Sequence, residues 1–275
     1  MLCLEPSVVD AVWSAISSEL GEPGQVIDGP GRPRVPDRDC FTGLLTKLVT
    51  GVSWETLGQL QPVSAGTLKR RRRAWVQAGI FDSLFTQAIA GYNKLIGLNL
   101  SAVLVDGSTQ KAPRGGEGTG RNPTDKGKRG YKWSLATDAA GVPVGFVTDG
   151  ANVPDYQLLE PTLDVVASYG LLDQGVKVCC DRGYDYPLVH TLLTERNLAN
   201  RVRRKRKPGA PPPVQPQLLG RRWPVERTNA WLTNFGQLRR ATDRRLVDRD
   251  AWMALAVVLI LVTKLVNAKQ LRTQF

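Results

Sequence analysis

The chain has 275 residues, 42% of them hydrophobic, with 37 Lys and Arg against 25 Asp and Glu and a formal net charge of +12. This length and apolar content exclude a disordered chain and allow one large or two modest domains. A single histidine excludes every site that needs two imidazoles, so any metal has to be held by acidic residues.

The first 95 residues are predicted to be helical. Apolar residues at helical spacing predict a helix over 5–20, and a second helix is predicted from 38 to 50, where Gly51 ends it. Ser53 and Ser64 can each cap a short helix, with a turn between the two. Two short helices across a tight turn resemble a helix-turn-helix.

The second of these short helices, through LKRRRRAWV, is strongly basic. Leu68, Trp75 and Val76 are predicted to face the core. Plain helical packing is one interpretation, but the basic run favours contact with DNA phosphates or base edges. The candidate DNA-binding residues on this helix are Lys69, Arg70, Arg72 and Arg73.

From Leu98 onward the pattern changes to strands, which predicts a domain boundary near residue 95. Strand, helix and strand in succession imply a mixed α/β sheet. Five prolines in KPGAPPPVQPQ predict an exposed loop over 207–217, and Pro224 suits the first turn of the helix that follows. The predicted elements between are strands over 98–108, 131–138, 142–150 and 176–180, and helices over 156–170 and 186–197.

The positive charge is concentrated near the end of the chain. Residues 199–275 carry 17 basic and 4 acidic side chains, whereas residues 1–95 carry 10 and 9, and residues 96–198 carry 10 and 12. Such clustering indicates a surface that binds a polyanion, with a solvated basic surface kept for solubility as the alternative. The runs are RVRRKRK (201–207), RRWPVER (221–227) and RRATDRR (239–245).

Two aspartates each end an apolar predicted strand and precede a glycine-containing loop. Asp106 follows AVLV and Asp181 follows VKVCC. Ligands bind at the carboxyl ends of strands in α/β sheets, so the two carboxylates could converge on one divalent cation. Glu226 is the third candidate, because it is the only acid between Glu195 and Asp243. The alternative is that all three are ordinary strand-end and helix-start acids.

Several long motifs, in the same order, resemble one known family. They are GRPR (31–34), VDGSTQKA (105–112), GRNPTDKGKRGYK (120–132), GANVPDYQLLEPTLD (150–164), DRGYDYP (181–187) and RRWPVERTNAWLTNFGQLRR (221–240). Over nearly the whole chain the sequence resembles the DDE transposases of bacterial insertion sequences, specifically the insertion-sequence-five-like family. The resemblance implies an α/β fold with a ribonuclease-H-like mixed sheet and flanking helices, preceded by a helical, helix-turn-helix-type domain. It places a DNA-binding domain at 1–95 and a catalytic domain at 96–275.

The same resemblance implies roles for particular residues. Asp106, Asp181 and Glu226 match the family's three catalytic, metal-binding acids. Thr233 departs from the family pattern, which often has a lysine at that position, so Arg239 or Arg240 could supply the DNA-end contact instead. The further candidate DNA contacts are Lys132, Arg221, Arg222, Arg227, Arg239 and Arg240.

The activity implied is cleavage of phosphodiester bonds at transposon ends and joining of the 3′-hydroxyl to target DNA. Two Mg²⁺ (or Mn²⁺) ions, roughly 3.5 to 4 Å apart, would support such chemistry. The expected partners are double-stranded DNA, as terminal inverted repeats and target DNA, and a second copy of the chain in a homodimer on DNA. A non-catalytic DNA-binding regulator and a ribonuclease-H-like nuclease without strand transfer remain alternatives.

No export signal is visible, and the most apolar run, 252–262, has 11 residues, whereas a membrane span needs about 20. Four cysteines that include an adjacent pair indicate a reducing compartment. The sequence therefore predicts a cytoplasmic, nucleoid-associated protein with no membrane partner.

Overall fold

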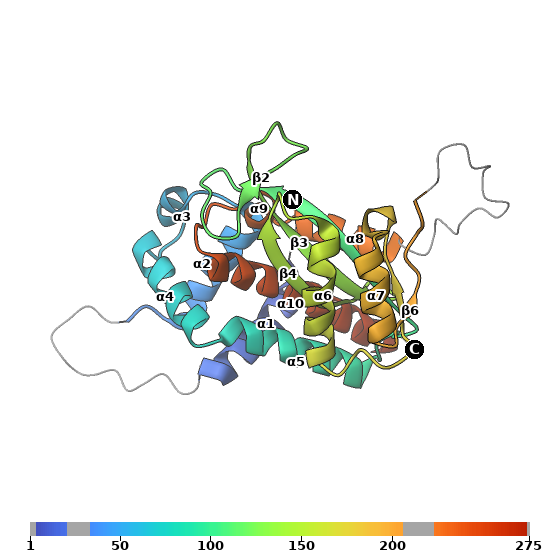
Figure 1. Ribbon diagram of the computed structural model, residues 1–275. Helices are drawn as coiled ribbons and strands as arrows, with labels where there is room; N and C mark the ends of the chain where they lie inside the picture. The colour runs from blue at the N-terminus through green and yellow to red at the C-terminus, as the bar shows by residue number, and fades with distance from the viewer. Residues whose placement is uncertain (1–3, 21–33, 206–222, 274–275) are drawn as a thin grey trace. The chain divides into compact units, whose positions relative to one another are not determined.

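The computed structural model describes residues 4–20, 34–205 and 223–273 (Figure 1). The chain divides into two compact units, one formed by residues 1–96 and 232–275 and the other by residues 97–231. The predicted loop over 207–217, together with Arg221 and Arg222, lies outside the described residues. The assignment of DNA binding to 1–95 and catalysis to 96–275 stays a prediction.

The first unit is helical and draws on both ends of the chain. Its core forms where α10 packs against α5 and α1, and where α2 packs against α4 and α9. The helix α5 was not among the predicted elements. The helices are α1 (Pro6–Leu20), α2 (Asp37–Thr50), α3 (Trp54–Leu60), α4 (Ala65–Gln77), α5 (Ile80–Leu95), α9 (Gly236–Arg239) and α10 (Leu246–Thr273).

The predicted helix boundaries around α3 and α4 are confirmed. The Oγ atoms of Ser53 and Ser64 accept hydrogen bonds from backbone N–H groups three residues later, at 3.0 and 3.3 Å. Gly51 ends α2 with a φ of 69°, a left-handed conformation that favours glycine. A side chain at Gly51 would also collide with the backbone of Gly236, 2.6 Å from the expected Cβ position. The sequence therefore allows α2 and α9 to pack backbone to backbone.

The long helix α10 is the centre of this unit. It has 28 residues and is long and apolar enough, by length and composition, to cross a membrane. Its residues from Ala251 to Leu261 are all buried within the protein, against helices such as α5 and α1. This burial is typical of the core helix of a soluble domain.

The second unit is built on a mixed sheet. Its strands are β1 (Ala102–Lys111), β2 (Gly120–Arg121), β3 (Arg129–Asp138), β4 (Pro143–Gly150), β5 (Lys177–Cys179) and β6 (Ala199–Asn200). Its helices are α6 (Asp155–Ser168), α7 (Pro187–Glu195) and α8 (Trp223–Thr233), with a short 3₁₀ helix η1 at Arg182–Tyr184. The boundary between the two units falls inside α8.

The strand order is β4-β3-β1-β5-β6, and the short β2 also pairs with β3. The strand β3 runs antiparallel to β1, β2 and β4, while β1, β5 and β6 run parallel. This is the ribonuclease-H-like arrangement that the family resemblance implies. Helices cover both faces. Ser134 bonds Thr162 of α6 at 2.8 Å, while its neighbour Trp133 bonds Asn229 of α8 at 2.8 Å. Because successive residues of a strand point to opposite faces, α6 and α8 lie on opposite sides of the sheet.

Candidate active site

Asp106 and Asp181 occupy matching positions on two neighbouring parallel strands. The last pair between β1 and β5 joins Leu104 to Cys179, and each aspartate lies two residues further along its own strand direction. Both aspartates are half-buried. The register of the sheet therefore brings the two predicted acids to the same edge.

The expectation that Asp106 ends its strand was wrong. The strand β1 continues to Lys111, because β3 keeps pairing with it as far as Lys111 and Gly130. What ends near Asp106 is the pairing with β5, so the aspartate borders the point where β1 loses its parallel neighbour. Asp181 does follow its strand directly, and its Oδ1 accepts a hydrogen bond from the N–H of Gly183 at 2.7 Å.

Glu226 lies in the first turn of α8 with an exposed side chain. The helix is attached to the hairpin between β3 and β4, where Thr228 Oγ1 donates to the carbonyl of Gly141 at 2.7 Å. One turn further on, Asn229 Nδ2 donates to Asp106 Oδ2 at 3.1 Å. These contacts hold the helix that carries Glu226 beside the strand that carries Asp106.

The pKa of a buried tyrosine is influenced by several acidic groups in this region. Tyr184 is 1% exposed, and its hydroxyl has no hydrogen-bond partner within the part of the chain that the structure describes. Burial raises the pKa of Tyr184 well above its ordinary value, and the nearby Cys180, Asp155, Asp106 and Asp181 raise it further. Four acidic groups therefore act on one phenol, which places Asp106 and Asp181 in a common electrostatic environment.

Asp155, which the sequence interpretation missed, is the additional acid. It begins α6, and its carboxylate lies so close to Gly107 that a Cβ there would collide with it. Lys132 donates from Nζ to Asp155 Oδ1 at 2.8 Å and is itself only 5% exposed. An acid directly before the predicted helix over 156–170, within the family-like motif GANVPDYQLLEPTLD, was the available signal. Since Lys132 is buried and paired, we leave it out of the DNA contacts proposed below.

The donor chemistry of the three predicted acids suits a hard divalent cation, because such ions take carboxylate oxygens. Two of them share one sheet edge, and the third lies on a helix bonded to that edge. Within residues 4–20, 34–205 and 223–273, no three His, Cys, Asp or Glu side chains stand close enough together to ligate an ion. The residue types fit the metal, while the arrangement of the side chains does not by itself form a complete ligand set.

The helix α4 presents exposed cations, as predicted, at Lys69, Arg70 and Arg73. Arg72 differs, because it is 6% exposed and pairs with Asp243 at 2.9 Å and Asp248 at 3.4 Å. Its guanidinium also lies over the rings of two tryptophans, Trp54 and Trp252, at 5.2 and 5.1 Å from their centroids. We therefore assign Arg72 to the interior of the unit and leave it out of the proposed DNA contacts.

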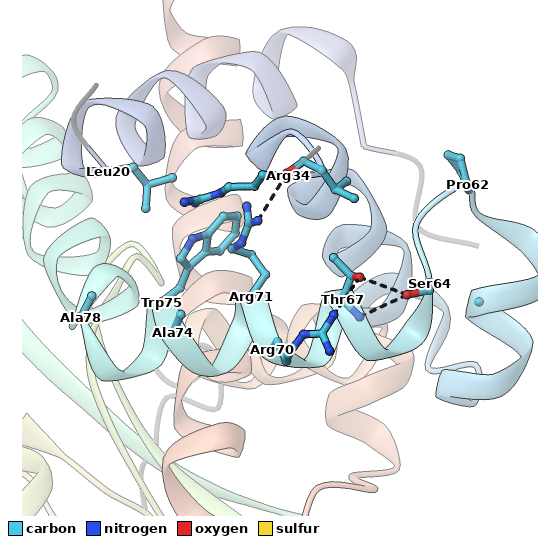
Figure 2. A pocket seen from close by; sticks show the side chains of 12 residues that line it. Leu20, Arg34, Pro62, Ser64, Thr67, Arg70, Arg71, Ala74, Trp75 and Ala78 are labelled. Atoms are coloured by element: carbon cyan, nitrogen blue, oxygen red, sulfur yellow. Dashed lines mark hydrogen bonds between the residues drawn. The ribbon is translucent and has the colours of Figure 1, made fainter. Parts of the chain in front are cut away.

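An arginine-lined cavity of about 940 Å³ runs along the same helix (Figure 2). Arg34 and Arg71 both pair with Asp37, and Arg70 lines the cavity as well. Burial, and then the charge of Arg34, lower the pKa of Arg71. Three arginines line the cavity and two of them share one carboxylate, so the cavity has net positive charge, which suits an anionic ligand such as a phosphate.

The other candidate DNA contacts differ in their surroundings. Arg239 and Arg240 are exposed at the end of α9. Arg227 lies over the rings of Trp223 and Trp231, at 4.5 and 4.8 Å, and donates to the carbonyl of Ala140 at 2.8 Å. Arg227 thus has a packing role in addition to any contact with DNA.

The only histidine of the chain, His190, belongs to a hydrogen-bonded cluster that includes Asp185 and Asn200. His190 Nε2 lies 2.7 Å from Asp185 Oδ1, and its Nδ1 lies 2.6 Å from Asn200 Nδ2. Hydrogen bonds from the N–H of Lys205 and from His190 lower the pKa of Asp185 to about 2. Asp185 therefore anchors the start of the basic run 201–207 to the second unit.

Two family models match the chain. The model described as "Transposase DDE domain" matches residues 98–261, and the model described as "Putative transposase of IS4/5 family" matches residues 8–85. The "Putative transposase for insertion sequence element IS402" of Burkholderia cepacia is 35% identical over 158 residues, which cover 55% of this chain and 72% of the relative. The "Insertion element IS402 uncharacterized 16.2 kDa protein" of the same organism is 31% identical over 121 residues, which cover 43% of this chain and 82% of the relative.

Among solved structures, the chain is similar to the piggyBac transposase in its synaptic complex with hairpin DNA, with a TM-score of 0.45 and 12% identity over 97% of this chain and 74% of that one. It is also similar to a pre-cleavage Mos1 transpososome, with a TM-score of 0.29 and 13% identity over 88% and 82% of the two chains. The DDE-domain match covers more than half of the chain and contains all three predicted acids. The chain therefore belongs to the DDE transposases of bacterial insertion sequences, a family of metal-dependent enzymes that cleave DNA strands and transfer them.

Proposed function

We propose that Asp106, Asp181 and Glu226 bind Mg²⁺ (or Mn²⁺) and form the site of strand cleavage and joining. The observation that carries this proposal is the matched placement of Asp106 and Asp181, two residues beyond the last pair of β1 with β5. Glu226 joins them through α8, whose Asn229 donates to Asp106. The side chain of Glu226 is exposed and therefore accessible to an ion and to DNA.

When bound there, two ions would activate the attacking oxygen and stabilise the leaving one. The three carboxylates would hold these ions beside the scissile phosphate. In cleavage, a water oxygen bonds to phosphorus at the transposon end, and the bond from phosphorus to the 3′-oxygen breaks and leaves a 3′-hydroxyl. In joining, that hydroxyl oxygen bonds to a target phosphorus as the target strand's own 3′-oxygen leaves with a proton. Neither step needs a covalent bond to the protein.

DNA recognition is proposed for the helix-turn-helix of the first unit. The exposed side chains of Lys69, Arg70 and Arg73 lie on its second helix, the position at which such motifs enter the major groove. The arginine-lined cavity beside them gives a phosphate of the DNA backbone a place to bind. We propose terminal inverted repeats as the sequence recognised. Arg221, Arg222, Arg227, Arg239 and Arg240 are proposed to contact the backbone of donor or target DNA.

We also propose that the enzyme acts as a homodimer on DNA, in the cytoplasm and associated with the nucleoid. Two inverted ends present the same sequence in two opposed orientations, which a two-fold dimer matches. Light scattering of the protein alone and bound to a duplex carrying the end sequence tests this. Two chains per pair of ends are expected, and one chain per pair would contradict it.

The catalytic proposal is tested with the purified full chain and a duplex carrying the terminal repeat that flanks its gene. Nicking is expected with Mg²⁺ or Mn²⁺ and none with EDTA. A pre-cleaved end should give products joined to a target plasmid, and cutting without joining would instead indicate a nuclease. Binding of the repeat without any cation-dependent nicking would indicate a regulator and overturn the proposal.

A further inference from the structure

Asn229 lies between a predicted catalytic aspartate and a buried tryptophan. The indole Nε1 of Trp133 donates to Asn229 Oδ1 at 2.8 Å, and Asn229 Nδ2 donates to Asp106 Oδ2 at 3.1 Å. Trp133 is fully buried and Asn229 is 7% exposed. The three side chains come from β3, α8 and β1, so a continuous hydrogen-bonded chain crosses one face of the sheet.

The indole N–H of Trp133 fixes the orientation of the Asn229 side-chain amide. An indole N–H can only donate, so the amide oxygen has to face Trp133, and the NH₂ group then has to face Asp106. Both side chains are shielded from water, which removes the solvent partners that would let the amide turn over. The donor that Asp106 receives is therefore fixed in direction by a residue that does not touch Asp106.

From these contacts we propose that Asn229 is a positioning residue for Asp106, set in orientation by Trp133. It holds one carboxylate oxygen of Asp106 in place. It also ties Asp106 to α8, three residues after Glu226, and residues three apart share one face of a helix. The amide thus controls both the orientation of the first acid and its separation from the third.

The effect expected is on metal binding as well as on catalysis. Loss of a hydrogen-bonding partner to a metal ligand typically lowers metal affinity or activity about 10- to 100-fold. The inference rests on the proposed assignment of Asp106 as a metal ligand, so the experiment includes Asp106→Asn. If Asp106→Asn still cleaves, the proposed site fails. If Asp106→Asn is inactive while Asn229→Ala behaves as wild type, the present inference alone fails.

The main variant is Asn229→Ala in the full chain. The Mg²⁺ concentration that gives half-maximal cleavage should rise about tenfold or more, and Mn²⁺ binding measured by calorimetry should weaken in parallel. Binding to the terminal duplex should not change. A lower melting temperature with an unchanged Mg²⁺ requirement and unchanged Mn²⁺ affinity would mean that Asn229 only supports packing, and would overturn the inference.

A second variant covers the case in which Asn229→Ala fails to fold. Asn229→Asp has the same shape and still accepts from Trp133, but it replaces the donor toward Asp106 with a negative charge. Cleavage should fall at least about tenfold while binding to the terminal duplex, which requires a folded protein, stays at the wild-type level. Wild-type cleavage by Asn229→Asp would overturn the proposal.

Trp133→Phe tests the orienting role. It removes the indole donor, so it should raise the Mg²⁺ requirement in the same direction as Asn229→Ala, and the double variant should require no more Mg²⁺ than Asn229→Ala alone. If the two substitutions raise the Mg²⁺ requirement additively, or if Trp133→Phe has no effect on it, Trp133 does not orient Asn229. Asn234→Ala, at an exposed asparagine just after α8, is the matched control and should behave as wild type.

Discussion

Asp106 and Asp181 occupy corresponding positions on neighbouring parallel strands, because each lies two residues past the Leu104–Cys179 pair in the register of β1 and β5. This relationship depends on backbone pairing rather than on the conformation of a loop. A substitution that keeps the size of either side chain should therefore leave the sheet intact and change only the charge and metal-binding ability of the site.

Asp106→Asn, Asp181→Asn and Glu226→Gln should each abolish strand cleavage and leave binding to the terminal duplex largely unchanged. A lost metal ligand removes several kcal/mol of transition-state stabilisation, so the rate should fall about a thousandfold or more. Single-turnover cleavage and gel-shift assays with Mg²⁺ check this. Asp173→Asn, at an exposed aspartate, is the control. Retained cleavage in any acid variant would remove that residue from the metal site.

Arg72 and Arg73 are adjacent on α4 and should respond in opposite ways. Arg72→Ala leaves Asp243 and Asp248 buried without their shared cation, which should destabilise the protein by about 3 to 5 kcal/mol. Arg73→Ala removes an exposed charge, so stability should stay within about 0.5 kcal/mol. Its DNA affinity should instead depend less on salt, by about 0.9 in the log-log slope. Chemical unfolding and a salt series of DNA binding check both, and similar stabilities of the two variants would contradict the burial of Arg72.

The buried Lys47 should make stability depend on pH in the alkaline range. Burial, opposed by Asp243 and assisted by Arg72, lowers the pKa of Lys47 from 10.5 to about 8. Because the folded pKa is the lower one, the unfolded chain binds more protons between pH 8 and 10.5, and stability from this group rises with pH there. The charged form costs up to about 3 kcal/mol below pH 8.

The measurement compares urea unfolding of wild type and Lys47→Met at intervals from pH 7 to 10. The variant has no group that titrates at this position, so other titrations cancel in the difference. Wild type should gain stability relative to Lys47→Met as the pH rises above 8. A difference that stays constant with pH would show that the ammonium of Lys47 is not desolvated in solution.

Gly107→Ala should destabilise the second unit. The added methyl would collide with the carboxylate of Asp155 and displace it from Lys132, at an expected cost of about 1 to 3 kcal/mol for overpacking. Gly91→Ala is the matched control, because Gly91 lies inside α5 with open space at its Cβ position. That substitution should raise stability by up to about 1 kcal/mol. Melting temperatures that move in the same direction would contradict the close contact at Gly107.

The elements that sequence predicts best are those with local causes. Ser53 and Ser64 cap their helices through bonds to residues three positions away, and Gly51 ends α2 through its own backbone conformation. Such signals need no knowledge of the rest of the fold. The length of β1, in contrast, depends on the rest of the fold, because its second half exists only through pairing with β3. The sequence pattern therefore suggested a strand that stops at Asp106.

In the candidate site, too, some features could be predicted from local sequence and others depend on distant parts of the fold. The residue types of Asp106, Asp181 and Glu226 could be read from the motifs, and the strand pattern suggested that Asp106 and Asp181 reach the same edge of the sheet. Asn229 could not be found in this way, since its bond to Asp106 spans 123 positions. Arg72 was misread for a related reason. A run of four arginines gives no indication of which one turns inward toward acids near the other end of the chain.

The first unit takes its helices from both ends of the chain, and this has a consequence for synthesis on the ribosome. Chains grow from the amino terminus, so α4 emerges long before Asp243 and α10 are translated. Until then Arg72 has no acid to pair with, and the apolar faces of α1 and α5 have no α10 to cover them. Products of interrupted translation should therefore fail to form this unit and should not compete with finished protein for transposon ends.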